Sequence, residues 1–295
     1  MKNLTPFINP IEWVRAWKFK KQSRRYDKSS FDLELHLYSR ILNSRMLHYG
    51  YFDDPEIKAE EISIGLLESA QVRYADNIIE FVKDTEGAIL DVGCGMGGLA
   101  DMIHARGLEV EVLTPDKNQI AFIAKNYPHL KSHNVKYEKL DSERKYGAII
   151  NSESLQYIRL ADAFRKSSEL LAPGGKWVIV DYFRLNDTGV SKSSHLLENF
   201  RLEVEAGGWK VEYEKDITAN ILPTLKLIHM YVDRILLPLK HYGYEKLRFK
   251  KPGLYYLSGR VRDSIDRKFD REAAASDPAR FLSEKRYMFF VLAKI

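Results

Sequence analysis

The sequence predicts an α/β protein built on an open sheet with helices on both faces. Residues 88–92, Ala-Ile-Leu-Asp-Val, form a short apolar run that is typical of a buried strand. A glycine-rich turn follows at 93–98, and residues 99–105 then have the pattern of a helix. After this unit, helical patterns alternate with strand-like runs at 109–113, 147–151 and 176–182. Such alternation indicates one α/β core, and 295 residues are enough to bury it.

The turn after the first strand has glycine at positions 93, 95 and 97. Glycine permits positive φ and removes Cβ atoms, so the free N–H groups of a helix N-terminus can approach a ligand. Written as Gly93-x-Gly95-x-x-Gly98, the turn also satisfies the dinucleotide-binding fingerprint. Asp91 separates the two alternatives, because its carboxylate would repel a pyrophosphate and attract an ammonium and a sulfonium. The turn therefore favours S-adenosylmethionine (SAM) over a nicotinamide cofactor.

Two motifs carry a family resemblance. Asp91-x-Gly93-x-Gly95-x-Gly97 resembles the first motif of class I SAM-dependent methyltransferases, and residues 171–176, Leu-Ala-Pro-Gly-Gly-Lys, resemble the turn before their fifth strand. The motifs stand in the family's order, about 80 residues apart. The resemblance implies a Rossmann-like, seven-stranded methyltransferase sheet that binds SAM through the residues of the first motif.

The N-terminal residues 1–84 are expected to form a helical cap or lid. Trp13 and Trp17 lie among lysines and arginines in a segment, 11–27, that we expect to be helical. Three interpretations stay open for this segment: contact with an anionic membrane surface, closure over the active site, or packing as a solvated amphipathic helix.

Residues 46–54 resemble the "HYGY" segment of the sterol and cyclopropane-fatty-acid type methyltransferases, where it precedes the cofactor domain. The resemblance implies that Tyr49 and Tyr51 cover the charged end of SAM. An aromatic face beside a sulfonium is a favourable cation–π contact. A surface turn with two buried tyrosines is the structural alternative.

The second strand, expected at 109–113, ends without the acid that binds the ribose in many class I methyltransferases. Leu113 and Thr114 occupy that place. The sterol and cyclopropane branch has a "T-x-S-x-x-Q" pattern there, which Thr114 and Gln119 resemble. The resemblance implies ribose binding by these two residues, with Asp116 as the alternative. Thr114 is also expected to cap the next helix, and helix capping is the alternative role of Asp116.

The third strand is expected at 135–140, from its alternating pattern. Asp141 then falls where the family's adenine-binding loop lies, and the resemblance assigns it to the adenine. The fourth strand follows after only a few residues, so we expect this loop to be short.

The fourth strand ends at Asn151, and ligands of open α/β sheets bind beyond the carboxyl ends of the strands. The resemblance makes Asn151 a cofactor contact and places active-site polar residues directly after it. Glu153 is our leading catalytic candidate, as a base or as a stabiliser of positive charge, with Tyr49 and Tyr157 as supporting aromatic groups. Capping of the next helix is the alternative for Glu153.

The sheet of the family ends in an antiparallel strand, for which residues 286–293 are the candidate. Residues 217–284 are then a substrate-binding insertion. Its apolar start, 217–239, forms either a pocket wall or a surface that docks on the core, and the basic and aromatic cluster at 246–256 either holds an anionic head group or is a solvated face. We divide the chain into the ranges 1–84, 85–216, 217–284 and 285–295.

Composition narrows the function classes. The single cysteine excludes an intrachain disulfide and a cysteine-cluster metal site, and we expect no metal. A net charge of +5 is too small and too dispersed to favour nucleic acid as a partner. No apolar run reaches the roughly 18 residues that span a bilayer. We expect a cytoplasmic protein, with peripheral membrane contact left open and the oligomeric state undetermined.

These observations predict a SAM-dependent methyltransferase that acts on a hydrophobic small molecule with or without an anionic head group. C-methylation of a lipid or isoprenoid is the first expectation. The alternatives are N- or O-methylation of a polar metabolite, a nicotinamide-dependent oxidoreductase, and a SAM-binding protein without catalytic activity.

Overall fold

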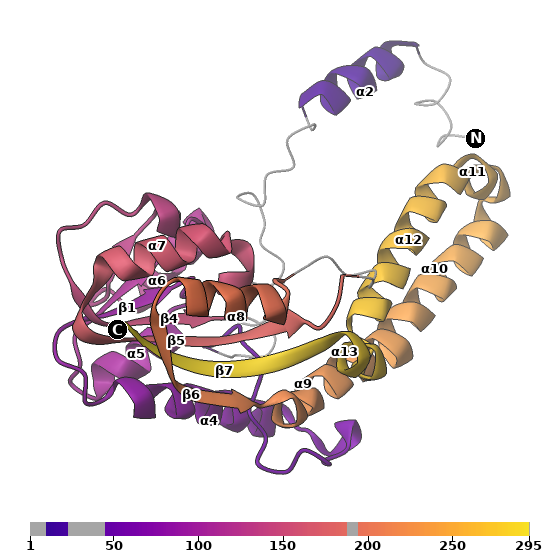
Figure 1. Ribbon diagram of the computed structural model, residues 1–295. Coiled ribbons are helices and arrows are strands. Elements are labelled where there is room, and N and C mark those ends of the chain that lie inside the picture. Colours follow the sequence, from indigo (N-terminus) through magenta and orange to yellow (C-terminus); the bar gives the residue numbers. More distant parts are fainter. Residues whose placement is uncertain (1–9, 23–44, 188–193, 295) are drawn as a thin grey trace.

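The computed structural model describes residues 10–22, 45–187 and 194–294. These residues form an α/β fold around a seven-stranded sheet of order β3-β2-β1-β4-β5-β7-β6 (Figure 1). The predicted fold class is therefore confirmed. The strands are β1 Ile89–Val92, β2 Val110–Leu113, β3 Lys131–His133, β4 Tyr146–Ser152, β5 Leu171–Arg184, β6 Trp209–Asp216 and β7 Lys285–Lys294.

Helices cover both faces of the sheet. One hydrophobic cluster joins one face to α4, α5, α6 and α9, and a second joins the other face to α7 and α8. The helices are α2 Pro10–Gln22, α4 Ile64–Val82, α5 Gly98–Ala105, α6 Lys117–Asn126, α7 Leu160–Leu170, α8 Leu197–Ala206, α9 Thr218–Tyr231, α10 Leu237–Lys250, α11 Pro252–Leu257, α12 Gly259–Ala275 and α13 Pro278–Glu284. None of the described helices has the length and apolarity that crossing a bilayer requires.

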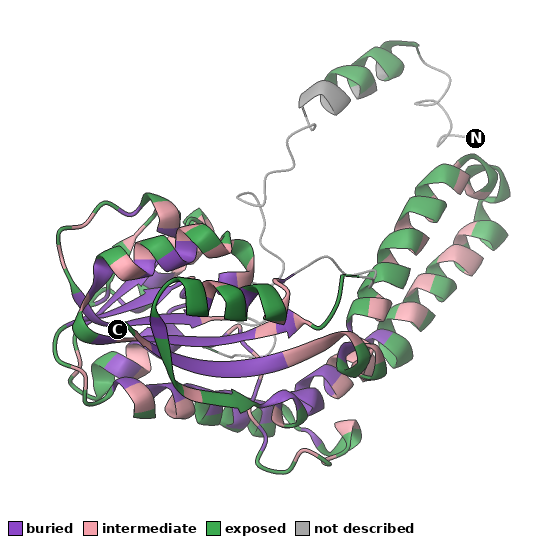
Figure 2. Cartoon of the chain, in the orientation of Figure 1, coloured by how far each residue is buried: buried purple, intermediate pink, exposed green. Residues whose placement is uncertain are grey.

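β1 and β2 are buried throughout (Figure 2). The apolar run 88–92 predicts this for β1. β1 pairs in parallel with β2 and β4, so the carboxyl ends of these three strands meet at one edge. β7 is antiparallel to both β5 and β6, as expected for the last strand. Leu171 pairs with Tyr146 and Lys176 with Ala148, so the Pro-Gly-Gly turn is an irregularity inside β5.

The prediction for the third strand was wrong. The structure has β3 at Lys131–His133, and Tyr137–Lys139 is a single 3₁₀ turn. Tyr137 is buried with its hydroxyl 2.8 Å from the Ser167 hydroxyl on α7, so it serves to anchor a helix and not to extend a strand. The alternation of Val135 and Tyr137 reflects burial beneath that helix, because both side chains belong to the cluster on this face.

The prediction that Thr114 caps α6 was wrong, and the alternative capping role of Asp116 is confirmed. Asp116, not Thr114, is the N-cap, and its carboxylate accepts hydrogen bonds from the backbone N–H groups of Asn118 and Gln119 at 2.7 and 3.3 Å. The Thr114 hydroxyl accepts one from the Asp116 N–H at 3.2 Å. Thr114 therefore stabilises the turn that precedes the helix.

The chain before β1 packs partly in the core. α4 buries Ile78, Ile79 and Val82 completely, so it forms a layer under the sheet as well as leading into β1. α2 leaves Trp13 and Trp17 63 % and 61 % exposed. Residues 23–27 of the predicted basic helix lie outside the described residues. The division at residues 84 and 216 stays a proposal.

The start of the C-terminal insertion docks on the core. Ile217, Ile221 and Leu225 are buried in the cluster that α4 and α5 form with the sheet. The sequence left two alternatives for the apolar stretch 217–239, a pocket wall or a surface that docks on the core. These three residues dock on the core. Beyond a π-helical turn at Val232–Leu236, α10 and α12 extend away from the sheet (Figure 1).

Glu111 on β2 is a buried carboxylate in a cationic setting. Its oxygens lie 2.9 Å from Lys131 Nζ, 2.7 Å from His133 Nε2 and 2.6 Å from Arg144. Burial alone would raise the pKa of Glu111, but hydrogen bonds from His133, Lys131 and Tyr146 outweigh it and lower the pKa to about 2.

Replacing Glu111 with glutamine should lower the free energy of unfolding by about 2 kcal/mol at neutral pH, because it removes the buried negative charge that accepts hydrogen bonds from Lys131 and Arg144. A carboxylate with a depressed folded-state pKa stabilises the fold above its ordinary pKa of 4.5 and loses that contribution as the pH falls towards 2. Thermal melts of wild type and Glu111→Gln should therefore differ most near neutral pH and converge in acid. A gap that is equal at both pH values would contradict this account.

Candidate active site

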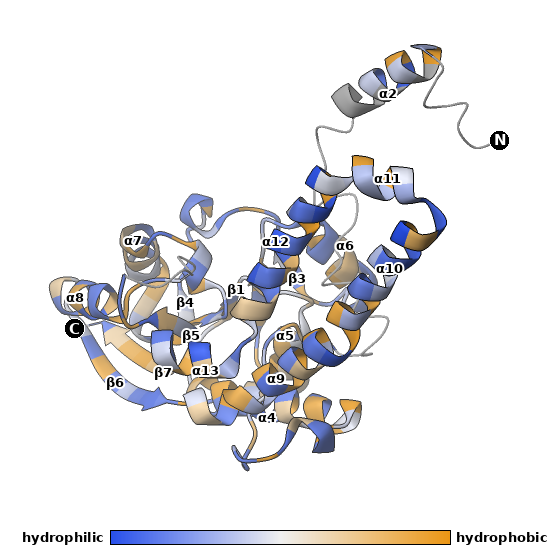
Figure 3. Ribbon diagram, turned by 90° about the vertical axis from the view of Figure 1, so that its right-hand side faces the viewer, coloured by the Kyte–Doolittle hydropathy of each residue, from blue (hydrophilic) through white to orange (hydrophobic). Residues whose placement is uncertain are grey.

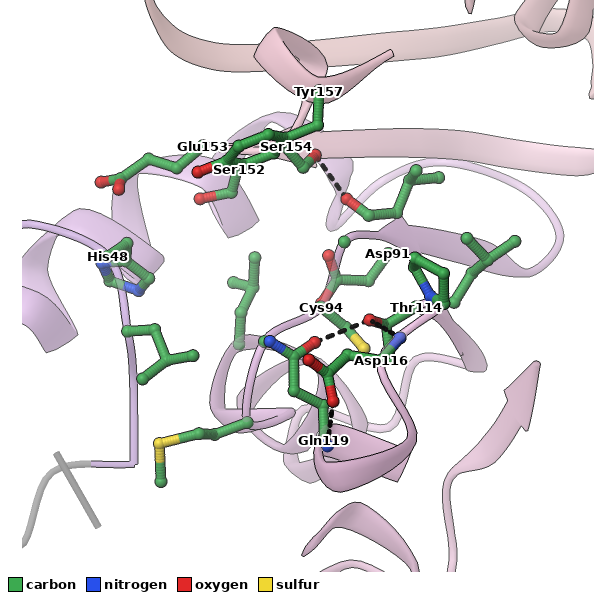
Figure 4. A pocket seen from close by; sticks show the side chains of 18 of the residues that line it. His48, Asp91, Cys94, Thr114, Asp116, Gln119, Ser152, Glu153, Ser154 and Tyr157 are labelled. Atoms are coloured by element: carbon green, nitrogen blue, oxygen red, sulfur yellow. Dashed lines mark hydrogen bonds between the residues drawn. The ribbon is translucent and has the colours of Figure 1, made fainter. Parts of the chain in front are cut away.

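A cavity of about 500 Å³ lies at the carboxyl ends of β1, β2 and β4. Its walls come from the glycine turn, the loop after β2, the segment after β4 and residues 45–48. In Figure 4 the side chains of Ser152, Glu153, Ser154 and Tyr157 form one side, and those of Thr114, Asp116 and Gln119 lie opposite. The strand ends thus gather residues that are far apart in the sequence.

The glycine turn brings bare backbone to the cavity. Gly93 and Gly95 have φ values of 75° and 54°, a conformation that side chains rarely adopt. A Cβ atom at Gly93 would lie 2.3 Å from Ser154 Cβ, and one at Gly95 would lie 3.2 Å from Leu47 Cδ1. Glycine at these positions therefore permits close packing of the turn against Ser154 and Leu47. The approach of a ligand to this backbone stays a prediction.

Asp91 supplies a buried carboxylate beside this turn. It is 1 % exposed and lines the cavity, and its Oδ2 has no hydrogen-bond partner among the described residues. Desolvation raises its pKa to about 7. A buried acceptor without a protein partner suits a hydrogen-bond donor on a ligand, and a cation beside it would favour the ionised form.

Thr114 and Gln119 lie together on the opposite wall. The Thr114 hydroxyl donates to Gln119 Oε1 at 2.6 Å, and both residues line the cavity. Asp116 lines it as well, with one carboxylate oxygen engaged in capping α6. The wall therefore presents a carboxylate, a hydroxyl and an amide, which suit a polyhydroxylated ligand.

Glu153 stands on strained backbone where β4 ends. Its φ is 52°, one of two positive values among described residues other than glycine. Its N–H donates to the Val180 carbonyl at 2.8 Å, which ties the turn to β5. Its Oε1 accepts from the Tyr49 N–H at 2.8 Å and from the Tyr287 hydroxyl at 2.6 Å. These contacts hold the carboxylate in one place beside the cavity.

A line of hydroxyl groups leads to Glu153. The Tyr287 hydroxyl lies 3.0 Å from that of Tyr74, which lies 3.1 Å from the Ser152 hydroxyl. Burial, together with the charge of Glu153, raises the pKa of both tyrosines well above the usual value. Because Tyr287 gives its one proton to Glu153, Tyr74 donates to Tyr287 in turn. The phenols act as donors that stabilise a negative charge on Glu153.

His48 lies beside Tyr49 and Tyr74, and one of its ring nitrogens, Nε2, has no hydrogen-bond partner among the described residues. Its Nδ1 donates to the Tyr49 carbonyl at 2.8 Å, and its ring stacks on Tyr74 with centroids 4.2 Å apart. Nε2 is buried without a partner among the described residues, and His48 lines the cavity. Burial lowers the pKa of His48 to about 4, so its Nε2 is a hydrogen-bond acceptor at neutral pH.

Eight predicted site residues, including the alternative Asp116, line one cavity: Asp91, Gly93, Gly95, Thr114, Asp116, Gln119, Glu153 and Tyr157. Tyr157 is 82 % exposed and stands at the mouth. The cavity thus unites both predicted ends of the site, the glycine turn and the segment after β4.

The structure places five other predicted residues outside the cavity lining: Tyr49, Tyr51, Gly97, Asp141 and Asn151. Tyr49 contributes its backbone to Glu153, and the Tyr51 hydroxyl accepts from Lys215 Nζ at 3.2 Å. Asn151 is fully buried between Ser154 and Trp177, which satisfy its amide.

Asp141 is exposed beyond the 3₁₀ turn, and residues 136–138 line the cavity in its place. The 3₁₀ turn at Tyr137–Lys139 takes the place of the expected third strand, and Asp141, which follows it, lies outside the cavity lining. No residue of the insertion 217–284 lines the cavity, so its expected role in substrate binding stays a proposal.

The sequence did not identify Tyr74, Tyr287 or the role of His48. These residues lie on three separate segments of the chain, and only the fold brings them into contact with one another and with Glu153. The sequence also did not identify Asp181, which is buried and accepts from the Gln156 and Tyr182 N–H groups at 3.1 and 2.8 Å. Burial raises the pKa of Asp181 to about 8. An acid at the end of the apolar run 177–180 was the signal that could have identified it.

Comparisons with known proteins agree with this geometry. A family model described as a methyltransferase domain matches residues 66–216. Geranyl diphosphate 2-C-methyltransferase of Saccharopolyspora erythraea is 33 % identical over 105 residues, 33 % of this chain and 37 % of that protein. Phosphoethanolamine N-methyltransferase 3 of Arabidopsis thaliana is 34 % identical over 105 residues, 32 % of this chain and 21 % of that protein. The chain thus covers less than half the length of these curated relatives.

Two solved structures share the fold. Geranyl diphosphate C-methyltransferase of Streptomyces coelicolor, in complex with Mg²⁺, geranyl-S-thiolodiphosphate and S-adenosyl-L-homocysteine, superposes with a TM-score of 0.59 at 19 % identity, over 84 % of this chain and 87 % of that one. Cyclopropane synthase MmaA2 of Mycobacterium tuberculosis gives 0.64 at 15 % identity, over 90 % and 96 %.

Proposed function

We propose a function from one premise, that this chain belongs to the methyltransferase family whose domain spans residues 66–216. The proposal is transfer of a methyl group from SAM to a carbon atom of a hydrophobic isoprenoid or lipid acceptor. The observation that carries it is Glu153, a carboxylate held on strained backbone beside the same cavity that Asp91 lines. One carboxylate suits a cationic cofactor, and the other suits a proton or positive charge on an acceptor.

The described residues fit SAM. The Asp91 carboxylate, whose Oδ2 has no partner among the described residues, suits the ammonium. The backbone at Gly93 and Gly95 lines the same cavity, and Thr114 with Gln119 suits the ribose hydroxyls. When bound, SAM supplies a methyl group on positively charged sulfur.

Glu153 has the chemistry that C-methylation needs. Methylation of a double bond leaves positive charge on the acceptor, and a proton must then leave it. The Glu153 carboxylate stabilises that charge and accepts the proton, while Tyr287 and the Tyr49 N–H hold its Oε1 in position. The exposed ring of Tyr157 offers a π face at the cavity mouth.

A second candidate is methylation of nitrogen or oxygen in a polar metabolite, and His48 is the observation that favours it. Its neutral, bare Nε2 is suited to accept a hydrogen bond from an amine or hydroxyl. The match to a phosphoethanolamine N-methyltransferase is in line with this alternative. A nicotinamide-dependent oxidoreductase and a non-catalytic SAM-binding protein stay as outcomes of the tests.

The decisive experiment incubates the purified chain with methyl-labelled SAM and with lipid and polar extracts of the source cells, followed by mass spectrometry. Label in a lipid product supports the proposal, and fragmentation locates the methyl group. If only a polar product carries the label, the second candidate, methylation of nitrogen or oxygen in a polar metabolite, is supported instead. Stabilisation of the protein against heat by NAD and not by SAM would contradict both.

The affinity for SAM should rise about tenfold between pH 5.5 and pH 7, because Asp91, with a pKa of about 7, must ionise to hold a cation. His48, with a pKa of about 4, is neutral throughout this range. Calorimetric titration of wild type and Asp91→Asn checks this. The variant should bind more weakly and without that pH dependence, and a flat wild-type profile would remove Asp91 from the cofactor site.

A cytoplasmic location and peripheral membrane contact stay predictions from the sequence. Membrane contact is in line with the proposed substrate, because a hydrophobic acceptor partitions into membranes.

A further inference from the structure

The helical hairpin formed by α10, α11 and α12 extends away from the sheet (Figure 1). Figure 3 shows α11 at its far end. Lys240 pairs with Asp266 at 2.8 Å, and the Arg262 guanidinium lies 3.5 Å from the centroid of the Tyr255 ring. The first contact joins the two long helices, α10 and α12, and the second joins α12 to α11, although none of the three helices contains a buried residue. The hairpin is therefore a defined element that the protein's core does not require.

The far end of the hairpin, residues 246–260, exposes large apolar side chains. Phe249 is 91 % exposed, Tyr256 84 % and Leu257 77 %. We call this segment the hairpin tip. Phe249 lies on α10, and Tyr256 and Leu257 lie on α11. Exposing large apolar side chains on two successive helices to water is unfavourable.

Basic residues surround these apolar groups. Between 240 and 262 the sequence has seven lysines and arginines and one acid, Glu245. Lys250, Lys251 and Arg260 are exposed and form no ion pair with any residue that the structure describes. The rest of α12 mixes acids and bases, so the positive charge is concentrated at the tip.

We propose that the hairpin tip docks on an anionic lipid bilayer. Phe249, Tyr256 and Leu257 insert at the boundary of head groups and acyl chains, and the basic residues face the lipid phosphates. A bilayer offers negative charge and apolar volume side by side, which matches both properties of the tip. A second hairpin tip, or the basic helix α2, would instead meet it with like charge.

This docking goes beyond the proposed methyl transfer and does not depend on it. No tip residue lines the cavity, so the two sites are physically separate. If the acceptor is a lipid or isoprenoid, docking brings the cavity to the phase in which that acceptor is concentrated.

The test is flotation of the full chain with vesicles of phosphatidylcholine alone, or of phosphatidylcholine with phosphatidylglycerol. Wild type should float only with the anionic vesicles, and less as NaCl is raised. The apolar variant Phe249→Ser/Tyr256→Ser/Leu257→Ser and the charge variant Lys250→Glu/Lys251→Glu/Arg260→Glu should each bind more than about tenfold more weakly.

Two matched controls isolate the tip. Lys125→Glu/Lys139→Glu/Lys210→Glu changes the net charge equally at exposed sites outside the hairpin. Leu202→Ser removes a 58 % exposed apolar side chain on α8. Both should float nearly as wild type does, and unchanged SAM affinity and melting temperature should show that every variant is folded.

Three outcomes would overturn the proposal. In the first, wild type does not float with anionic vesicles. In the second, the tip variants float as wild type does while Trp13→Ser/Trp17→Ser does not, which assigns the contact to α2. In the third, the charge control loses binding as fully as the tip charge variant, which indicates a net-charge effect. If the first outcome is accompanied by loss of a dimer in the tip variants, it assigns the tip to a second copy of the chain.

Discussion

Replacing Glu153 with glutamine is expected to lower turnover about a hundredfold and to leave the affinity for SAM within about twofold. Glutamine keeps the shape and can accept from Tyr287, but it carries no negative charge and cannot take a proton. Since Glu153 lies on the far side of the cavity from Thr114 and Gln119, we expect cofactor binding to be preserved. Rates of labelled-product formation and calorimetric SAM titration measure the two quantities separately.

Tyr287→Phe is the companion variant, because it removes the 2.6 Å hydrogen bond and retains the carboxylate. It should lower turnover less, by about tenfold, since it loosens the position of Glu153 without deleting it. Glu143→Gln, at an exposed acid outside the cavity lining, is the control and should act as wild type does. Equal turnover in Glu153→Gln and wild type would remove Glu153 from the mechanism.

Gly95→Val is expected to weaken SAM binding by about a hundredfold or more. Gly95 lines the cavity with φ of 54°, and its missing Cβ would lie 3.2 Å from Leu47 Cδ1. A branched side chain therefore occupies space that the cofactor needs and also strains the backbone.

Gly107→Val separates these two effects. Gly107 also has a positive φ, 81°, but no atom lies within 4 Å of its Cβ position, and it does not line the cavity. Both variants should lower the melting temperature, whereas only Gly95→Val should lose SAM binding. Calorimetric titrations that show equal losses would mean that backbone strain, and not a filled cavity, explains the effect.

The parts of the fold that the sequence predicted well depend on local patterns. The apolar run 88–92 and the glycines after it each lie within one short stretch, and both are where the sequence placed them. The Pro-Gly-Gly turn, which was expected before the fifth strand, lies inside β5. Two errors, the third strand and the cap of α6, arose where local signals competed. Tyr137 alternates as in a strand but is buried under α7, and Thr114 precedes a stronger capping acid, Asp116.

For the site, the sequence by itself determined which groups follow the ends of the first, second and fourth strands, because parallel strands bring their carboxyl ends to one edge. Asp91, Gly95, Thr114, Gln119 and Glu153 therefore line one cavity. Only the tertiary structure decided what holds Glu153. Its partner Tyr287 is 134 positions away, on the last strand, and the antiparallel register of β7 against β5 sets where that hydroxyl lies. Such a contact depends on the packing of distant segments, which no local pattern encodes.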